Sequence, residues 1–289
     1  MKFDTKKTLW MLFLLVSQGI FAQTMNEWDD VRTTSVNREE AHTLLMTDKQ
    51  QSLNGTWKFR WVKDPLRRPA DFFNVDYNDA TWTDIDVPST WQVYGIRNNK
   101  NWDKPLYVNQ LFPFTYDSNY SVMASRPDDW TYNNSMKNPV GSYRRHFTVP
   151  SDWNGEDIFL RFNGAGHGYY VWVNGQFVGY AEDSYLPSEF NVTDFVNVGG
   201  DNVVAVQVYR FTSGSFLECQ DYWRLTGIMR DVILWAAPKS RIEDFFIRTT
   251  SLQNGQKDAR VQLDVTLSGV PLTDGEVVVR ILDGQRLLL

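Results

Sequence analysis

The chain has 289 residues, of which 42% are hydrophobic and 15% aromatic, with 12 Trp, 13 Tyr and 18 Phe. This balance excludes a disordered tail, a collagen-like fibre and a multi-span membrane protein, and the length favours two domains over one. The formal net charge of −6 argues against binding nucleic acid, and the single cysteine excludes both a disulfide framework and a cysteine-rich zinc site.

An apolar run near the N-terminus predicts a secretory signal peptide. Three lysines precede the run, which covers residues 9–16, and the small residue Ala22 stands before the expected cleavage point. The run is shorter than the roughly 20 apolar residues that a membrane span needs. We therefore expect residues 1–22 to be removed during export to the periplasm or the medium, after which nothing attaches the protein to a membrane.

The next segment, residues 23–50, is predicted to be an irregular leader with one short helix. Asn37 suits an N-cap, and Glu40 follows three positions later, as in a capping box.

Residues 51–237 show the period-2 alternation of β-strands and little helical periodicity. In residues 55–61 the aromatic side chains fall on one face and the polar ones on the other. Asn174 and Gly175 separate two β-rich runs and predict a hairpin, because both turn positions need a positive φ. The other expected strands are 143–149, 158–162, 169–173, 176–180, 203–209 and 231–235. Many short strands with little helix predict an all-β sandwich.

A junction at Ala236–Lys239 is expected to start a second sandwich over residues 238–289. Apolar residues at 261, 263, 265 and 267 alternate with polar ones there. The stretch is about half the length of an immunoglobulin-like domain, and it stops in three leucines. We therefore expect an incomplete domain and a chain that is a fragment of a longer protein.

Four segments combine acidic, amide, aromatic and arginine side chains. This composition is not expected of a strand that is buried only for packing. They cover residues 87–92, 105–109, 179–190 and 214–232. Buried charges must be paired or must coordinate something, so Arg224, Arg230 and Asp231 form either a structural salt-bridge cluster or part of a site. Asp221 stands beside two aromatics, and a sugar site needs both a carboxylate for hydroxyls and a ring for the apolar face. Asn109 offers donors and an acceptor to vicinal hydroxyls.

These segments, together with residues 53–57 and 142–145, resemble the N-terminal sugar-binding domain of glycoside hydrolase family 2 β-galactosidases, the large lac-type bacterial enzymes. The most specific matches are Gln-Asp-Tyr-Trp-Arg-Leu-Thr-Gly-Ile at 220–228 and Leu-Pro-Ser-Glu-Phe at 186–190. The resemblance covers nearly all of the chain after the signal peptide, in order. It implies a jelly-roll, galactose-binding-like sandwich over residues 51–237, the start of an immunoglobulin-like sandwich, and a (β/α)₈ catalytic barrel beyond this chain.

The resemblance also implies roles for individual residues. Asn109 and Asp221 contact the galactosyl ring of a β-galactoside, and Asp221 also ligates a sodium ion beside the 6-hydroxyl. Trp223, Arg224 and Glu218 support this site. The pair of catalytic glutamates of a retaining β-galactosidase, and a Mg²⁺ site, belong to the barrel. No catalytic residue is therefore expected in this chain, and the fragment alone should be inactive.

Relatives of this type are often homo-oligomers, so a tetramer or dimer is implied, with the leader contributing to assembly. The chain departs from the family pattern at residues 164–167, which we read as local packing, and this leaves His167 without a role. The three histidines have no ligand spacing, which argues against zinc. Glu182 and Asp183 are unsuited to a glycosidase pair, because adjacent strand residues point to opposite faces.

Two other functions stay open at this stage. A non-catalytic carbohydrate-binding module shares the sandwich fold. A sister glycosidase, β-glucuronidase or β-mannosidase, shares the family. The run at 220–223 favours galactose, and a glucuronate pocket would need basic groups that the sequence does not place.

Overall fold

The computed structural model describes residues 25–43, 45–107, 138–183, 185–216, 218, 223–253, 258–269, 276–283 and 285–287. The signal peptide expected at residues 1–22 lies outside this range. Within it, no helix is long and apolar enough to cross a membrane.

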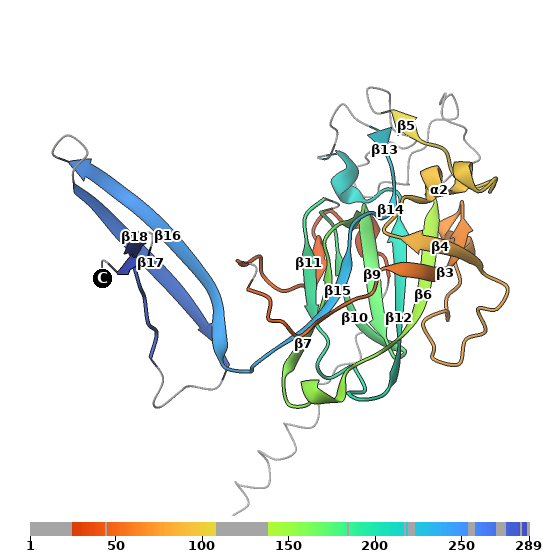
Figure 1. Cartoon of the computed structure of the whole chain (residues 1–289). Helices are drawn as coiled ribbons and strands as arrows, with labels where there is room; N and C mark the ends of the chain where they lie inside the picture. The colour runs from red at the N-terminus through yellow and green to blue at the C-terminus, as the bar shows by residue number, and fades with distance from the viewer. Residues whose placement is uncertain are drawn as a thin grey trace, which may run out of the picture.

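Two antiparallel sheets make up the main body of the protein (Figure 1). The larger sheet has the order β1-β10-β9-β12-β6-β3-β4 and the smaller has the order β11-β7-β15-β2. The strands of the larger sheet are β1 (Ser35–Val36), β3 (Gly55–Val62), β4 (Thr83–Val87), β6 (Val140–Thr148), β9 (Gly168–Val173), β10 (Gln176–Ala181) and β12 (Asp201–Tyr209). Those of the smaller sheet are β2 (Gln50–Ser52), β7 (Asp157–Phe162), β11 (Ser188–Asn191) and β15 (Val232–Ala237). The predicted all-β class and the expected strands between residues 55 and 235 are confirmed.

The two sheets share one hydrophobic core, which makes them a sandwich. Val204, Val206 and Val208 of β12 pack in the same cluster as Leu160 of β7 and Leu234 of β15, all of them buried. Alternation along the strands places these valines on one face of the larger sheet. The predicted hairpin joins β9 to β10, with Asn174 at φ 51° and Gly175 at φ 81°.

The opposite face of the larger sheet carries a second, aromatic core. The residues that alternate with the first core on β9 and β12, including Tyr170, Trp172 and Tyr209, pack there with Phe72 and Trp28. The short 3-10 helices η1 (Glu27–Asp29) and η2 (Pro65–Arg67) lie in the two segments that cover this face. The larger sheet is therefore buried on both faces. Many of the aromatic residues of the chain pack on this second face.

The leader is bound to the sandwich along most of its length, and the helix predicted after Asn37 is wrong. Asn37 has φ 53°, and its side-chain amide donates to the Val178 carbonyl at 2.9 Å. Strand β1 pairs with β10, and the Glu39 N–H donates to the Glu189 carbonyl at 2.9 Å. The capping-box pattern was overridden because the backbone groups of this segment pair with strands instead of with each other.

Replacing Trp28 with alanine is expected to lower the free energy of unfolding by about 3 kcal/mol. The ring of Trp28 stacks on Tyr209 with 5.2 Å between centroids, and its removal leaves a cavity in the aromatic core. Urea unfolding of the two proteins measures the difference. Trp223→Ala is the matched control: 57% of that residue is exposed, so the loss there should stay below about 1 kcal/mol. Equal losses of unfolding free energy at the two positions would contradict a stabilising role for the packing of the leader on the sandwich.

Sequence reasoning missed one helix, α2 (Trp91–Arg97), because its seven residues are too few to establish a period. Shorter elements are β5 (Leu106–Tyr107), β8 (Ala165–Gly166), β13 (Trp223–Arg224), β14 (Gly227–Ile228), and the 3-10 helices η3 (Ser151–Trp153) and η4 (Ser213–Phe216).

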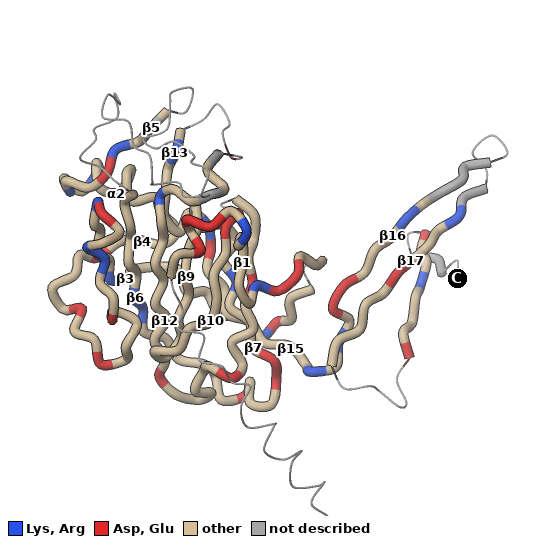
Figure 2. The backbone as a smooth tube through the Cα atoms, turned by 180° about the vertical axis from the view of Figure 1, so that it is seen from behind, with Lys and Arg blue, Asp and Glu red and all other residues tan. Residues whose placement is uncertain are grey.

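After the sandwich the chain forms a long antiparallel hairpin, β16 (Arg241–Gln253) with β17 (Asp258–Ser268), and a short pair, β18 (Leu282–Asp283) with β19 (Arg286–Leu287). The alternation predicted at residues 261–267 lies on β17. Arg241 holds the hairpin to the sandwich through Asp157 at 2.7 Å, and the Thr43 N–H donates to Asp244 at 2.8 Å. The immunoglobulin-like domain expected over residues 238–289 stays a prediction. Acidic and basic positions are interspersed over the sandwich and the hairpin (Figure 2).

Candidate functional site

The four segments singled out in the sequence meet at one end of the sandwich, where α2, β5, β13 and β14 lie together (Figure 1). Strand β13 pairs with β5, with Trp223 opposite Tyr107. The Thr226 carbonyl accepts from the Trp91 N–H at 3.0 Å, and Arg230 donates to the Tyr185 carbonyl at 2.7 Å. Residues far apart in the chain are thus joined into one surface by strand pairing and by hydrogen bonds to backbone carbonyls.

The close approach of two of these segments needs a glycine. Gly227 has φ 150°, and a Cβ atom built on it would lie 2.5 Å from the Ser89 carbonyl oxygen. The Ser89 N–H donates to the Ile228 carbonyl at 2.8 Å on the same contact. Any other residue at position 227 would push residues 87–92 away from the segment that carries β13 and β14.

Asn109 and Asp221, the two residues predicted to contact the sugar, lie outside the described residues. Their roles stay predictions.

Trp223 and Tyr107 form an aromatic pair at the end of the sandwich. Their ring centroids are 5.6 Å apart at an interplanar angle of 61°, and 57% of Trp223 is exposed. Most described tryptophans are buried in the two cores, so an open one beside a second ring is unusual for this chain. Such a pair provides the flat apolar surface on which a sugar ring packs.

A buried polar layer supports this surface from below. Asp103 and Arg210 form an ion pair whose two side chains are fully buried. Arg210 also donates to the Lys104 carbonyl at 3.1 Å, and Asp103 accepts from the Gln92 amide at 3.2 Å. Gln92 in turn accepts from the Thr226 N–H at 2.9 Å. The network crosses from the helix α2 to the segment after β13, so it fixes their relative position.

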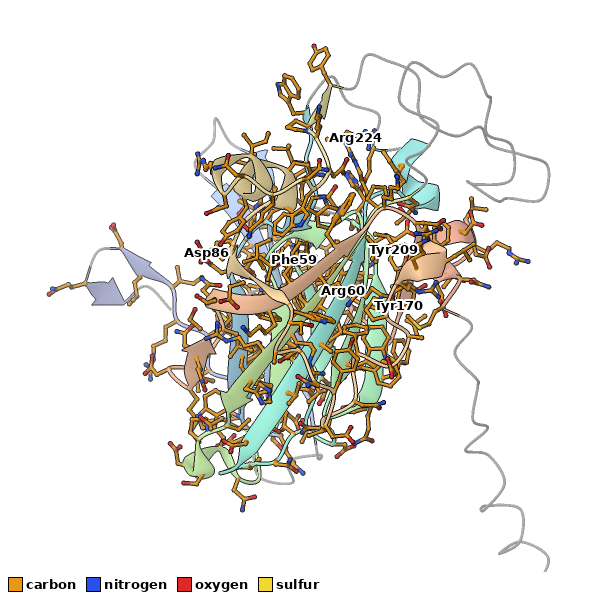
Figure 3. All side chains as sticks on the ribbon, turned by 90° about the vertical axis from the view of Figure 1, so that its right-hand side faces the viewer. Phe59, Arg60, Asp86, Tyr170, Tyr209 and Arg224 are labelled. Atoms are coloured by element: carbon orange, nitrogen blue, oxygen red, sulfur yellow. The ribbon has the colours of Figure 1, made fainter. Side chains whose placement is uncertain are left out.

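Arg224, predicted as a supporting residue, is fully buried at this end of the sandwich (Figure 3). Its guanidinium donates to the Ser215 carbonyl at 3.1 Å and to the Glu218 carbonyl at 2.7 Å. Arg230 bonds to the Tyr185 carbonyl and Asp231 accepts from Asn54 at 2.7 Å. These three charged residues have different partners at the contacts described, and the salt-bridge cluster considered for them stays a prediction.

His167, left without a role by the sequence, belongs to this site. The side chain is fully buried, and its Nδ1 lies 2.5 Å from Oε2 of Glu218. Burial lowers the pKa of His167, and the Glu218 carboxylate only partly offsets that effect. In the neutral ring, the tautomer that carries its proton on Nδ1 is the one that donates to the carboxylate. Sequence patterns gave no signal for this contact, because its partner lies 51 positions away.

Glu182 is a second buried acid at this end. The sequence argument excluded it only as one member of a catalytic carboxylate pair with Asp183. Its carboxylate accepts from the Tyr180 hydroxyl at 2.6 Å, whereas Asp183 is exposed and faces Arg38 at 3.5 Å. Burial raises the pKa of Glu182 to about 7, while hydrogen bonds from Tyr180 and Thr212 act against it. The two carboxylates occupy different environments, in agreement with the argument against a catalytic pair.

The raised pKa of Glu182 predicts a pH-dependent stability difference from the Glu182→Gln variant. In the unfolded chain the carboxyl ionises near 4.5, but in the folded protein it stays protonated up to about 7. The contribution of this group to stability is therefore complete below pH 4.5 and is lost as the pH rises through 7. Relative to Glu182→Gln, the wild-type free energy of unfolding should fall by about 2–3 kcal/mol between pH 4.5 and 8.

Urea unfolding at several pH values measures this difference, and Glu40→Gln, at an exposed position, should show none. A wild-type curve parallel to that of Glu182→Gln would show that Glu182 is ionised in the folded protein at neutral pH. Among the described residues, no group of three or more His, Cys, Asp or Glu is arranged to hold a metal ion.

Comparisons with known proteins agree with the geometry. Residues 50–238 match the family "Glycosyl hydrolases family 2, sugar binding domain". The chain is 35% identical over 257 residues to a protein named beta-galactosidase from Priestia megaterium, and 36% identical over 251 residues to one from Halalkalibacterium halodurans. These alignments cover 83% and 81% of this chain and 23% of each relative. The chain thus spans about a quarter of the length of the curated relatives it matches.

Among solved structures, the sandwich is similar to that of a β-glucuronidase from Ruminococcus gnavus in complex with uronic isofagomine. The TM-score is 0.56 at 18% identity, covering 81% of this chain and 36% of the other. At that identity the likeness shows the fold alone.

Proposed function

Because the chain belongs to glycosyl hydrolase family 2, with the sugar binding domain of that family at residues 50–238, we propose that it is the N-terminal part of an exported retaining β-galactosidase. The observation that carries the proposal is the 35–36% identity, over most of this chain, to proteins named beta-galactosidase. In this proposal the chain recognises terminal β-D-galactose, and two glutamates of a downstream barrel cleave the glycosidic bond.

We propose Asn109 and Asp221 as the galactose contacts. The pairing of Trp223 with Tyr107 supports this, because it joins the two segments of the sequence to which Asp221 and Asn109 belong. The exposed ring of Trp223 gives this end of the sandwich an apolar surface. A carboxylate and an amide next to an apolar platform match the hydroxyl-rich edge and the C–H face of a hexose.

The division of work between the two domains is physically reasonable. The barrel would supply the acid/base and the nucleophile, which must lie about 5 Å apart across the bond in a retaining enzyme. The sandwich would hold the galactosyl ring at a fixed distance from them. Contacts remote from the scissile bond lower the barrier by fixing position, and this is a role for a rigid, buried framework like the one beneath β5 and β13.

The cofactors and the assembly are part of the same proposal. Asp221 would bind sodium through a carboxylate oxygen, the donor type that hard cations prefer, and a Mg²⁺ site would belong to the barrel. The signal peptide at residues 1–22 would direct the protein to the periplasm or the medium. A homo-oligomer, dimer or tetramer, would be the working form.

The test is a hydrolysis assay on the full-length protein. The 4-nitrophenyl β-D-galactoside should be cleaved at least 100-fold faster, by kcat/KM, than the β-D-glucuronide or the β-D-mannoside. Preference for either of the other sugars would assign the protein to a sister activity. Galactose binding without hydrolysis of any of the three would favour a binding module. A protein that neither binds galactose nor hydrolyses any of the three glycosides would refute the proposal.

A further inference from the structure

Residues 39–43 of the leader pass between the sandwich and the hairpin, and we call this segment the clasp (Figure 1). At one end, the Glu39 N–H donates to the carbonyl of Glu189 on β11 at 2.9 Å. At the other end, the Thr43 N–H donates to the Asp244 carboxylate on β16 at 2.8 Å, and the Thr43 hydroxyl donates to the next carbonyl of that strand at 3.1 Å. The clasp is therefore bonded to both parts of the protein.

The middle of the clasp is open to solvent. Glu40 and Ala41 are exposed. A cleft of about 310 Å³ borders the clasp toward the sandwich, and one of about 300 Å³ borders it toward the hairpin. The contacts at its ends therefore hold the clasp more than packing along its length does. The ion pair of Arg241 with Asp157 also joins the hairpin to the sandwich, so a looser clasp changes how the hairpin is held without releasing it.

His42 joins the clasp to a buried carboxylate. Its Nε2 lies 3.0 Å from Oε1 of Glu189, and its Nδ1 lies 2.8 Å from the Thr43 carbonyl oxygen. A carbonyl oxygen and an ionised carboxylate can only accept hydrogen bonds, whereas a neutral imidazole has a single N–H to donate. The imidazolium is the form that donates to both partners at once. The side chains of His42 and Glu189 are only 16% and 4% exposed, so solvent screens their attraction little.

The Glu189 carboxylate is fixed on the smaller sheet. The indole N–H of Trp235 on β15 donates to it at 2.8 Å, and the Arg161 guanidinium on β7 donates at 3.4 Å. Any movement at the contact with His42 therefore falls on the clasp and not on the sheet. Glu189 belongs to the run at 186–190 that the sequence singled out and to which the proposed function gives no role.

Acidic groups outnumber basic groups among the described residues that share a cleft with His42. The acids are Glu39 and Glu40 of the clasp, Asp183 after β10, Glu189 on β11, and Glu243 and Asp244 on β16. The bases are Arg38 before the clasp, Arg161 on β7 and Arg241 on β16. Burial opposes protonation of His42, but its hydrogen bonds to the Thr43 carbonyl and to Glu189 outweigh burial and raise its pKa above the usual 6.5.

We propose that residues 39–43 fasten the hairpin to the sandwich as a clasp, and that protonation of His42 tightens it. The charged ring donates to both of its acceptors, and loss of the proton leaves one of the two hydrogen bonds. Because the pKa of His42 is raised in the folded protein, its stabilisation of the clasp is complete below pH 6.5 and is lost as the pH rises through the folded-state pKa. The hairpin is thus held more tightly in mild acid than in mild alkali.

Hydrogen exchange of the full-length protein tests the clasp at two reporter amides, those of Glu39 and Thr43. Electron-transfer fragmentation resolves the single amides, and the rates are corrected for their intrinsic dependence on pH. In the wild type, the protection of both amides should fall at least about 3-fold between pH 6 and pH 8.5. In His42→Gln, which keeps a donor but cannot be charged, the change should stay below about 1.5-fold. His146→Gln, at an exposed position on β6, is the matched control and should behave as the wild type does.

A flat wild-type profile would overturn the proposal without any variant, and so would equal pH dependence in the wild type and His42→Gln. Glu39 is the competing titratable group, because burial, with Glu189 and Glu243 nearby, raises its pKa above 4.5. Glu39→Gln should keep the wild-type change between pH 6 and pH 8.5. Loss of that change in Glu39→Gln would assign the pH dependence to Glu39 and refute the role of His42.

Asp244→Ala removes the acceptor at the hairpin end of the clasp. The Thr43 amide should then exchange rapidly at both pH values, while the Glu39 amide keeps its pH dependence. A Thr43 amide that stays protected in Asp244→Ala would show that the clasp does not hold the hairpin. The measurement needs no glycoside, so its outcome is independent of the proposed function.

Discussion

Replacing Asp221 with asparagine is expected to lower kcat/KM of the full-length enzyme for a β-galactoside by about 100-fold. The carboxylate is proposed to accept hydrogen bonds from a sugar hydroxyl and to ligate sodium. Hydrogen bonds to a charged group contribute about 1.5–3 kcal/mol each, and 2.7 kcal/mol corresponds to about 100-fold in rate. Steady-state kinetics with and without added sodium measure the effect, and the variant should also lose its dependence on sodium.

The matched control for this substitution is Asp201→Asn. Asp201 is exposed at the start of β12, at the opposite end of that strand from the site. It should retain wild-type kcat/KM and wild-type sodium dependence. If Asp221→Asn behaves in the same way, the galactose and sodium contacts do not involve Asp221.

Replacing Asp103 with alanine should lower the free energy of unfolding by about 3–5 kcal/mol. The substitution leaves the Arg210 guanidinium charged in a fully buried place, without the carboxylate that balances its charge. It also removes an acceptor from the Gln92 amide. Urea unfolding at pH 7 measures the loss.

Asp84→Ala provides the comparison for Asp103→Ala. Asp84 pairs with Lys58 at 2.8 Å, but more than half of its side chain is exposed, and surface pairs contribute at most about 1 kcal/mol. A similar small loss at both positions would mean that the buried pair is relaxed or hydrated, and that it does not fix α2 against the segment after β13.

Local sequence patterns predicted the parts of the fold that depend on near neighbours. The short run of β-branched and other apolar residues at 203–209 identified β12, a strand buried on both faces. Asn174 and Gly175 identified a hairpin because the turn itself demands positive φ. The helix predicted in the leader was wrong for the opposite reason. A helical cap at Asn37 is a local preference, whereas the pairing of β1 with β10 is set by a strand more than 140 residues away.

The candidate site divides in the same way. Segment composition identified the four stretches that meet at one end, and the structure brings them together. Composition missed the layer beneath them, since a buried histidine, a buried glutamate with a raised pKa and the Asp103–Arg210 pair acquire their roles from partners in distant segments. The residues that touch a ligand leave a local signature, and those that hold them in place often do not.

Strand β15 pairs with β7 on one side and with β2 on the other, so Ile233 lies opposite Ser52 as well as Arg161. The strand that begins the smaller sheet and the strand that completes it are separated by almost the entire domain. During synthesis, β2 must wait for β15 to leave the ribosome before its hydrogen bonds form. Such distant pairing makes closure a late and slow step of folding, and a nascent chain that stops short of residue 237 exposes the edges of β2 and β7 to aggregation.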